Sequence, residues 1–162
     1  MPNTVNRIIN TFIKNGFFAY AVGGCVRDSL LNTVPSDWDI CTSALPKDMK
    51  RLFQKTVDTG IQHGTVSILL DGGIFEVTTF RCDGDYKDHR RPEHVTFTKS
   101  ITEDLARRDF TVNAMAYNET EGFIDPFGGA KDLKNKCIKC VGDPDTRFLE
   151  DALRMLRAVR FA

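Results

Sequence analysis

The sequence carries no net charge, because its 22 Lys and Arg residues are balanced by 22 Asp and Glu residues. The field of the whole chain therefore cannot attract nucleic acid, and any such attraction must come from local clustering of charge. From position 131 onward, eight Lys or Arg residues stand against five Asp or Glu residues. Zero net charge thus does not exclude an RNA partner, and a basic surface is predicted in the C-terminal fifth.

The sequence also lacks any run of roughly 20 apolar residues, the length that spans a bilayer. Its N-terminus has apolar residues at helical spacing, broken by polar ones, unlike the continuous apolar core of a signal peptide. We therefore expect an intracellular, cytoplasmic protein with no membrane partner. The five cysteines are an odd number in a chain of this size, so reduced thiols are expected.

The apolar segments predict a single α/β domain of the α+β kind, with a small mixed sheet flanked by helices. Helices are predicted at the N-terminus, at 25–31, after Pro46, at 105–117 and at 146–161. Strands are predicted at 17–22, 38–42, 66–70 and 74–80. The polar stretch 82–94, with its Gly, Pro and charged residues, is predicted to be a loop.

Two carboxylates, Asp37 and Asp39, stand at positions i and i+2 of a predicted strand, so both point to one face while Trp38 points to the other. Two carboxylates on one face repel each other unless a cation lies between them. Mg²⁺ prefers one or two carboxylates together with phosphate oxygens and water. The alternative for this motif alone is a surface strand with two solvated acids.

A glycine pair, Gly23 and Gly24, ends the strand before these acids and begins a helix that carries Arg27. Glycines let the backbone approach a phosphate closely, and an arginine adds a bidentate contact. Followed by two acids at this distance, the pair predicts a binding site for a nucleotide phosphate.

Six ordered motifs resemble the class II tRNA nucleotidyltransferase and bacterial poly(A) polymerase family, within the polymerase β superfamily. They are the segments 23–28, 37–40 (with Thr42 and Ala44), 76–81 and 83–92, Arg-Arg-Asp-Phe-Thr at 107–111 with Asn113, and Glu-Asp at 150–151 with Arg154. The resemblance covers essentially the whole chain. It implies a polymerase β-like head at 1–142 and, at 143–162, the first, nucleotide-selecting helix of a helical neck whose remainder, with body and tail, is absent.

The resemblance implies an enzyme that adds C and A to the tRNA 3′ end from CTP and ATP, releasing pyrophosphate. Addition of CC or A alone and poly(A) synthesis remain alternatives, as does a nucleotide-binding head fragment without turnover. The resemblance links an intact loop at 82–94 to the switch from C to A. The oligomeric state stays open.

Further site residues lie outside the two carboxylates. Glu76, on a predicted strand, is either a third acid near the metal or an ordinary solvent-facing residue. Asp109 and Asn113 are four residues apart on one face of the predicted helix, where they could meet a ribose. The resemblance assigns Arg108 to the nucleotide phosphates.

The last predicted helix has an apolar arc and an opposite charged arc. The resemblance makes Asp151 and Arg154 of the charged arc a protein template for the base. Asp151 can accept from the exocyclic amine of cytosine or adenine, and Arg154 can donate to the adjacent ring nitrogen, whereas uracil and guanine present the opposite pattern. Arg157 and Arg160 are implied as further nucleotide contacts, and Arg160 lies at the edge of the apolar arc.

Overall fold

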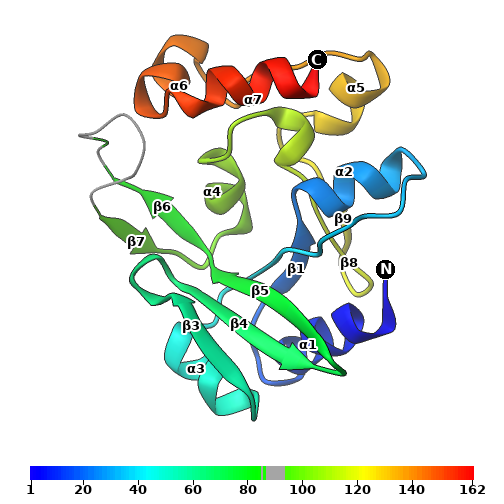
Figure 1. Ribbon diagram of the computed structural model, residues 1–162, viewed down its shortest axis with the longest axis vertical. Helices are drawn as coiled ribbons and strands as arrows, with labels where there is room; N and C mark the ends of the chain where they lie inside the picture. Colours follow the sequence, from blue (N-terminus) through cyan, green and yellow to red (C-terminus); the bar gives the residue numbers. More distant parts are fainter. Residues whose placement is uncertain (85, 87–93) are drawn as a thin grey trace.

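The computed structural model describes residues 1–84, 86 and 94–162 (Figure 1). Its helices are α1 (Asn3–Lys14), α2 (Gly24–Leu30), α3 (Pro46–Leu52), α4 (Ile101–Ala106), α5 (Gly129–Lys134), α6 (Pro144–Glu150) and α7 (Leu153–Phe161), with 3₁₀ turns η1 (Ile61–His63) and η2 (Thr111–Asn113). Its strands are β1 (Ala19–Val22), β2 (Ile40–Thr42), β3 (Thr56–Gly60), β4 (Thr65–Leu70), β5 (Gly73–Thr79), β6 (Arg81–Asp83), β7 (Val95–Phe97), β8 (Ala116–Asn118) and β9 (Gly122–Ile124).

In the described part of the chain, seven strands form one sheet in the order β3-β4-β5-β2-β1-β8-β9. Strands β2 and β5 run parallel, with Ile40 opposite Val77, and the other pairs are antiparallel. The sheet is therefore mixed, which confirms the predicted fold class. Strands β6 and β7 pair separately, so the predicted loop at 82–94 begins and ends in a short β-hairpin, and positions 85 and 87–93 lie outside the described residues.

Helices cover both faces of the sheet (Figure 1). On one face, α1 buries the residues Val5, Ile8, Ile9 and Phe12, whose spacing of three and four places them on a single helix face. On the other face, Tyr20, Val22, Cys41 and Phe80 pack with Leu105 of α4. Ala19 and Ala21 of β1 belong to the first core and Tyr20 and Val22 to the second, so both faces of this strand are buried.

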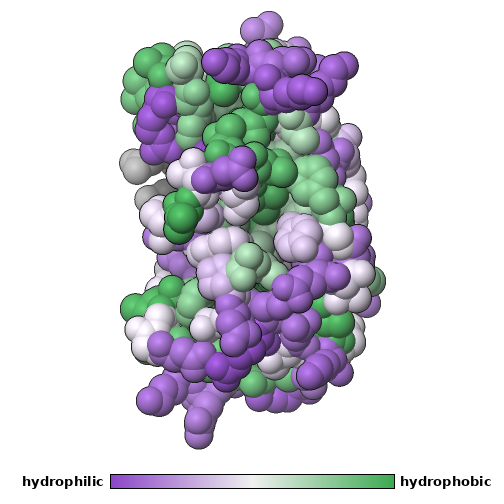
Figure 2. Space-filling model, turned by 90° about the vertical axis from the view of Figure 1, so that its right-hand side faces the viewer, coloured by the Kyte–Doolittle hydropathy of each residue, from purple (hydrophilic) through white to green (hydrophobic). Residues whose placement is uncertain are grey.

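The side of the molecule that carries α2 and the β8–β9 hairpin shows hydrophobic residues gathered across its middle (Figure 2). Leu30, Tyr117 and Phe123 are exposed there, and with Trp38 they line a shallow hollow of about 280 Å³. The helices that cover the sheet thus leave this edge of it open to solvent.

The prediction of a helix at 105–117 is wrong. Helix α4 ends at Ala106, Phe110 is extended (φ −123°, ψ 150°), and a 3₁₀ turn leads into β8. Phe110 forms a β-bridge with Cys140, and the amide of Thr111 donates to the carbonyl oxygen of Lys139 at 2.9 Å. These bonds to a distant segment stabilise an extended backbone, and they override the local helical pattern.

The single helix predicted at 146–161 is also wrong, because Asp151 is extended (φ −141°, ψ 105°) and separates α6 from α7. The Asp151 carboxylate accepts a hydrogen bond from the amide of Leu153 at 3.0 Å, and so satisfies a free amide at the start of α7. On α7, Leu156 is 68% exposed and Val159 is 77% exposed, whereas Arg154 is only 6% exposed. The charged arc therefore faces the rest of the molecule and the apolar arc faces solvent.

No helix among residues 1–84, 86 and 94–162 is long and apolar enough to cross a membrane. All five cysteines are free thiols, as expected from their odd number. The division into a head at 1–142 and a neck helix at 143–162 stays a prediction.

Candidate active site

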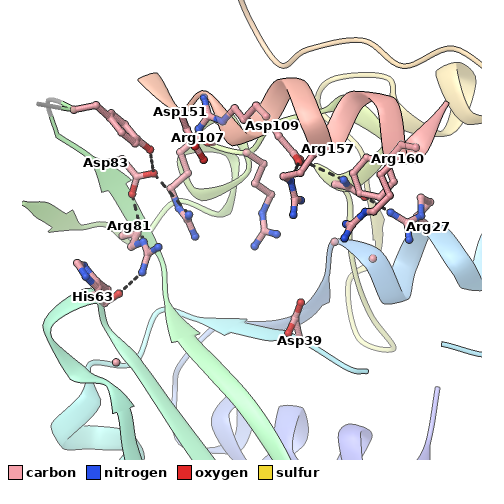
Figure 3. A pocket seen from close by; sticks show the side chains of 18 of the residues that line it. Arg27, Asp39, His63, Arg81, Asp83, Arg107, Asp109, Asp151, Arg157 and Arg160 are labelled. Atoms are coloured by element: carbon pink, nitrogen blue, oxygen red, sulfur yellow. Dashed lines mark hydrogen bonds and ion pairs between the residues drawn. The ribbon is translucent and has the colours of Figure 1, made fainter. Parts of the chain in front are cut away.

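A cleft of about 760 Å³ lies between the sheet and the C-terminal helices (Figure 3). Among the described residues, seven arginines and four aspartates line it, an excess of three positive charges in a chain with none overall. They are Arg27, Arg81, Arg107, Arg108, Arg154, Arg157 and Arg160, with Asp39, Asp83, Asp109 and Asp151. The cleft therefore suits a polyanion such as a triphosphate.

Most residues of the predicted site come together in this cleft. Its described lining includes Gly24, Arg27, Asp39, Arg108, Asp109, Asn113, Asp151, Arg154, Arg157 and Arg160. Two predicted residues, Asp37 and Glu76, are not among the lining residues. Segments far apart in the sequence thus supply one site, as the ordered motifs predict.

Asp37 and Asp39 precede β2 instead of lying within it, since the strand begins at Ile40. The carbonyl oxygen of Asp39 accepts from the amide of Val22 at 3.0 Å, and Trp38 packs on the hydrophobic core. Desolvation by the cleft walls raises the pKa of Asp39, the charge of Arg108 lowers it, and the charge of Asp37 raises it. The net pKa of Asp39 lies above the ordinary value, so a nearby cation would stabilise the charged form of this carboxylate.

Glu76 precedes Val77, the partner of Ile40 on the parallel strand, so it stands level with Asp39 on the neighbouring strand. Its side chain is exposed. The described residues contain no group of three or more His, Cys, Asp and Glu side chains placed to hold a metal. A role for Glu76 as third ligand stays a prediction.

Gly23 meets two structural demands. Its φ of +78° lies in the region that favours glycine, and a Cβ atom at this position would come within 3.1 Å of Nη1 of Arg108. The guanidinium of Arg27, one turn further on, donates to Asp28 (2.7 and 2.9 Å) and to Asn113 (2.6 Å). Two arginines therefore lie against the glycine turn.

Asp104 is a site residue that the sequence analysis missed. It is fully buried, and its carboxylate accepts from Arg107 at 3.0 Å, from Arg108 at 3.3 Å and from the amide of Arg81 at 3.2 Å. Burial alone would raise the pKa of Asp104, but the charges of Arg107 and Arg108 outweigh it and hold that pKa below its ordinary value. The signal in the sequence that could have identified Asp104 is its spacing, three residues before Arg107 and four residues before Arg108.

Asp109 and Asn113 do meet, although a 3₁₀ turn and not a helix brings them together. Nδ2 of Asn113 donates to Oδ1 of Asp109 at 3.3 Å, and Nε of Arg157 donates to Oδ2 of Asp109 at 2.6 Å. Because Asn113 also accepts from Arg27, a continuous chain of hydrogen bonds joins α2, η2 and α7. This network fixes the relative positions of the turn and the last helix.

The two residues of the predicted template pair, Arg154 and Asp151, differ in burial. Arg154 is buried and donates to the carbonyl oxygens of Arg147 (3.0 Å) and Arg107 (3.2 Å) and to the carboxylate of Glu150 (2.6 Å). Its guanidinium also lies 5.9 Å from the ring centre of Tyr86. Asp151 is half-buried on the cleft wall, so the pair combines a fixed donor with an accessible acceptor.

A further end of the cleft is lined by Arg81 and Asp83, which belong to the motif segments 76–81 and 83–92 but were not predicted as site residues (Figure 3). There Arg81 donates to the carbonyl oxygen of His63, and its Nε lies 3.4 Å from Oδ1 of Asp83. Burial, and then the charge of Arg107, lower the pKa of Arg81. Elsewhere in the cleft, Nε of Arg108 is buried without a hydrogen-bond partner among the described residues.

Most of the chain matches a known protein family. The model of the family described as the poly A polymerase head domain matches residues 19–139. A CCA-adding enzyme of Geobacillus kaustophilus is 56% identical over 154 residues, which are 95% of this chain and 38% of the relative. A CCA-adding enzyme of Enterococcus faecalis is 54% identical over 155 residues, or 96% of this chain and 38% of the relative. The chain thus spans less than half the length of these relatives.

Solved structures agree with the sequence matches. The crystal structure of the Bacillus stearothermophilus CCA-adding enzyme in complex with CTP superimposes with a TM-score of 0.90 and 48% identity, over 99% of this chain and 39% of that one. The Thermotoga maritima CCA-adding enzyme complexed with tRNA gives a TM-score of 0.76 and 31% identity, over 97% of this chain and 36% of that one. Because the family model covers most of the sequence, the chain belongs to the poly A polymerase head domain family.

Proposed function

We propose that the chain is the catalytic head of a template-independent RNA nucleotidyltransferase that adds C and A to the tRNA 3′ end from CTP and ATP. The observation that carries the proposal is that one cleft contains Asp39, the arginines beside Gly23 and the pair Asp151 and Arg154. The proposed sites for activation, for the phosphates and for the base would thus be contiguous. The relatives named as CCA-adding enzymes, one of them solved with CTP and one with tRNA, support this choice.

Nucleotidyltransferases of this family generally use a divalent metal ion. We propose Mg²⁺, held by Asp37 and Asp39 with Glu76 as a possible third ligand. A hard cation of this kind, when bound, neutralises charge on the phosphates and on the attacking and leaving oxygens. The like-charged neighbour and the desolvation that raise the pKa of Asp39 support a cation at this position.

The reaction that fits the cleft is attack by the RNA 3′-hydroxyl on the α-phosphate, with release of pyrophosphate. Gly23 has no side chain, which allows the guanidinium of Arg108 to lie against the backbone of the glycine turn. We assign Arg108, Arg27 and the Gly23–Gly24 turn to the phosphates, and Asp109 with Asn113 to the ribose. The rate gain then comes mainly from positioning and charge neutralisation.

Base choice follows from the two members of the template pair. Asp151 offers an acceptor to the exocyclic amine of cytosine or adenine, and Arg154 offers a donor to the adjacent ring nitrogen. The contacts of Arg154 with Glu150 and two carbonyl oxygens hold that donor in one orientation. Uracil or guanine would leave buried polar groups unpaired, at about 1–3 kcal/mol for each mismatched group. Arg157 and Arg160, on the same helix as Arg154, are proposed as further nucleotide contacts.

The test is incorporation of labelled nucleotides into a tRNA transcript that lacks its 3′ CCA, with and without Mg²⁺. CMP and AMP are expected to be added, UMP and GMP are not, and omission of Mg²⁺ should stop the reaction. Long A tails without C would favour the poly(A) alternative. Binding of CTP without any incorporation would indicate a nucleotide-binding fragment.

The proposed addition of C and A acts on cellular tRNA, so we propose that it takes place in the cytoplasm.

A further inference from the structure

The two ends of the cleft differ in charge. At one end lie Arg27, Arg157 and Arg160, and Gly23 places Arg108 beside them. Even with Asp28, Asp109 and Asp104, the partner of Arg108, counted, four arginines stand against three acids at this end. Figure 3 shows Arg27, Arg157 and Arg160 at the end opposite His63 and Arg81, with Asp39 across the cleft from Arg157. The excess positive charge of the cleft therefore lies at the end that contains Arg27, Arg157 and Arg160.

The opposite end contains two arginines that are already matched by acids. Arg81 lies 3.4 Å from Asp83, and Arg107 lies 3.8 Å from the same carboxylate and 3.0 Å from Asp104. The rest of this end holds Tyr86, which donates to Asp83, and the template residues Asp151 and Arg154. It also holds a wall formed by Thr59, Gly60, Gln62 and His63, which we call the β3–η1 wall. Its side chains offer a hydroxyl, an amide and an imidazole, which suit hydrogen bonds to ribose hydroxyls and base edges.

The β3–η1 wall is held in place by its backbone. Gly64, directly after it, has φ +82°, and a Cβ atom there would come within 2.7 Å of the Phe97 ring. The amide of Gly64 donates to Ile61 at 3.1 Å, and its carbonyl oxygen accepts from Thr79 at 2.9 Å. Gln62 is exposed, so a fixed backbone turn presents this amide to the cleft.

An in-line displacement places the attacking and the leaving oxygens on opposite sides of the reacting phosphorus. The pyrophosphate carries most of the negative charge and belongs with the arginines beside Gly23. The attacking nucleotide must then approach from the other side of Asp39, where the β3–η1 wall lies. We propose that this wall binds the 3′-terminal nucleotide of the RNA primer, with Gln62 and His63 as positioning residues. This inference rests on the proposed function, because it requires an RNA 3′-hydroxyl as the nucleophile.

The first test separates primer binding from nucleotide binding. Gln62→Ala and His63→Ala, alone and combined, should raise the KM for a tRNA transcript lacking CCA by about 5- to 10-fold per lost hydrogen bond, with the KM for CTP unchanged. The His63 contact with Arg81 comes from the backbone carbonyl, so both variants keep it. Ile61→Ala, in the same turn but outside the cleft lining, is the matched control. An unchanged primer KM, or a rise in the KM for CTP alone, would overturn the proposal.

The second test does not need turnover. The same transcript, carrying a 3′-terminal 4-thiouridine, is irradiated with the full chain, and the cross-linked peptide is identified by mass spectrometry. Cross-links should fall within 59–63 and should weaken in the Gln62→Ala, His63→Ala double variant but not in Ile61→Ala. Cross-links on α5, α6 or α7 instead, or none at a saturating primer concentration, would refute this assignment. Cross-links at 59–63 without nucleotide incorporation would refute the proposed function but leave the primer site standing.

Discussion

The buried carboxylate of Asp104 lies 3.3 Å from the guanidinium of Arg108, one helical turn further along the chain. Asp104 has no exposed surface, and it also binds Arg107 and the backbone amide of Arg81. A single buried acid therefore holds two cationic side chains of the cleft from behind.

Replacement of that acid should destabilise the protein and weaken nucleotide binding together. Asp104→Asn leaves two guanidinium groups without their buried partner, and loss of a buried ion-pair partner costs about 3–5 kcal/mol. We expect a loss of this order in the free energy of unfolding, measured by urea denaturation. Asp58→Asn removes an acid that is 46% exposed and paired with Lys50, and it should cost under about 1 kcal/mol. Equal stability of the two variants would contradict the role assigned to Asp104.

The same carboxylate predicts a pH dependence of stability. Because the folded pKa of Asp104 is lowered, its contribution is fully present above the unfolded value of about 3.9 and is lost as the pH falls through the folded pKa. The difference in unfolding free energy between the wild type and Asp104→Asn should therefore be constant from pH 7 to 5 and shrink below about pH 4. A difference that grows on acidification would contradict the sign of this shift.

Two glycines allow the backbone cost of a substitution to be separated from its effect on the site. Gly23 and Gly72 have φ values of +78° and +79°, but a Cβ atom would meet open space at Gly72, whereas at Gly23 it would lie 3.1 Å from Nη1 of Arg108. Both Gly→Ala variants should lose about 1–2 kcal/mol of stability from backbone strain. Only Gly23→Ala should also weaken CTP binding, as measured by calorimetry. Equal CTP affinity of both variants would show that the close approach of Arg108 is dispensable.

The base-reading role of Asp151 predicts a change in specificity. Asp151→Asn adds a donor where only an acceptor was present, so uracil can be paired at this position. The ratio of kcat/KM for CTP over UTP should fall by roughly 5- to 150-fold, as expected for about 1–3 kcal/mol. Asp145→Asn, an exposed position on α6, is the control and should leave the ratio unchanged. A wild-type ratio in Asp151→Asn would exclude it from base reading.

The parts of the site that depend on short-range spacing could be predicted from the sequence. The glycine pair ends a strand and begins a helix, as predicted, and Asp39 and Trp38 face opposite sides of the chain. Asp109 and Asn113 meet because they are four residues apart, which brings them close in a 3₁₀ turn as well as in a helix. The contact between Asp109 and Asn113 was thus predicted correctly although the helix around them was not.

The parts that depend on distant partners could not be predicted. The backbone at Phe110 is extended because it pairs with Cys140, thirty positions away in the sequence. The β3–η1 wall and Arg81 reach the cleft only through the sheet order, which no local pattern reveals. Arg154 is buried and Leu156 exposed because the guanidinium finds a carboxylate and two carbonyl oxygens on the inner side of α7. Hydrophobic periodicity alone suggests the opposite orientation for this helix.

We propose that Asp37 and Asp39 hold the metal that activates the nucleotide, and alanine variants of the two residues show whether they do. Labelled CMP incorporation into a tRNA transcript lacking CCA is measured in Mg²⁺ for the wild type, Asp37→Ala and Asp39→Ala, with circular dichroism to confirm the fold. Both side chains are exposed, so their removal should leave the fold intact. We predict that each substitution abolishes incorporation. Turnover at the wild-type rate in either folded variant would contradict the metal assignment.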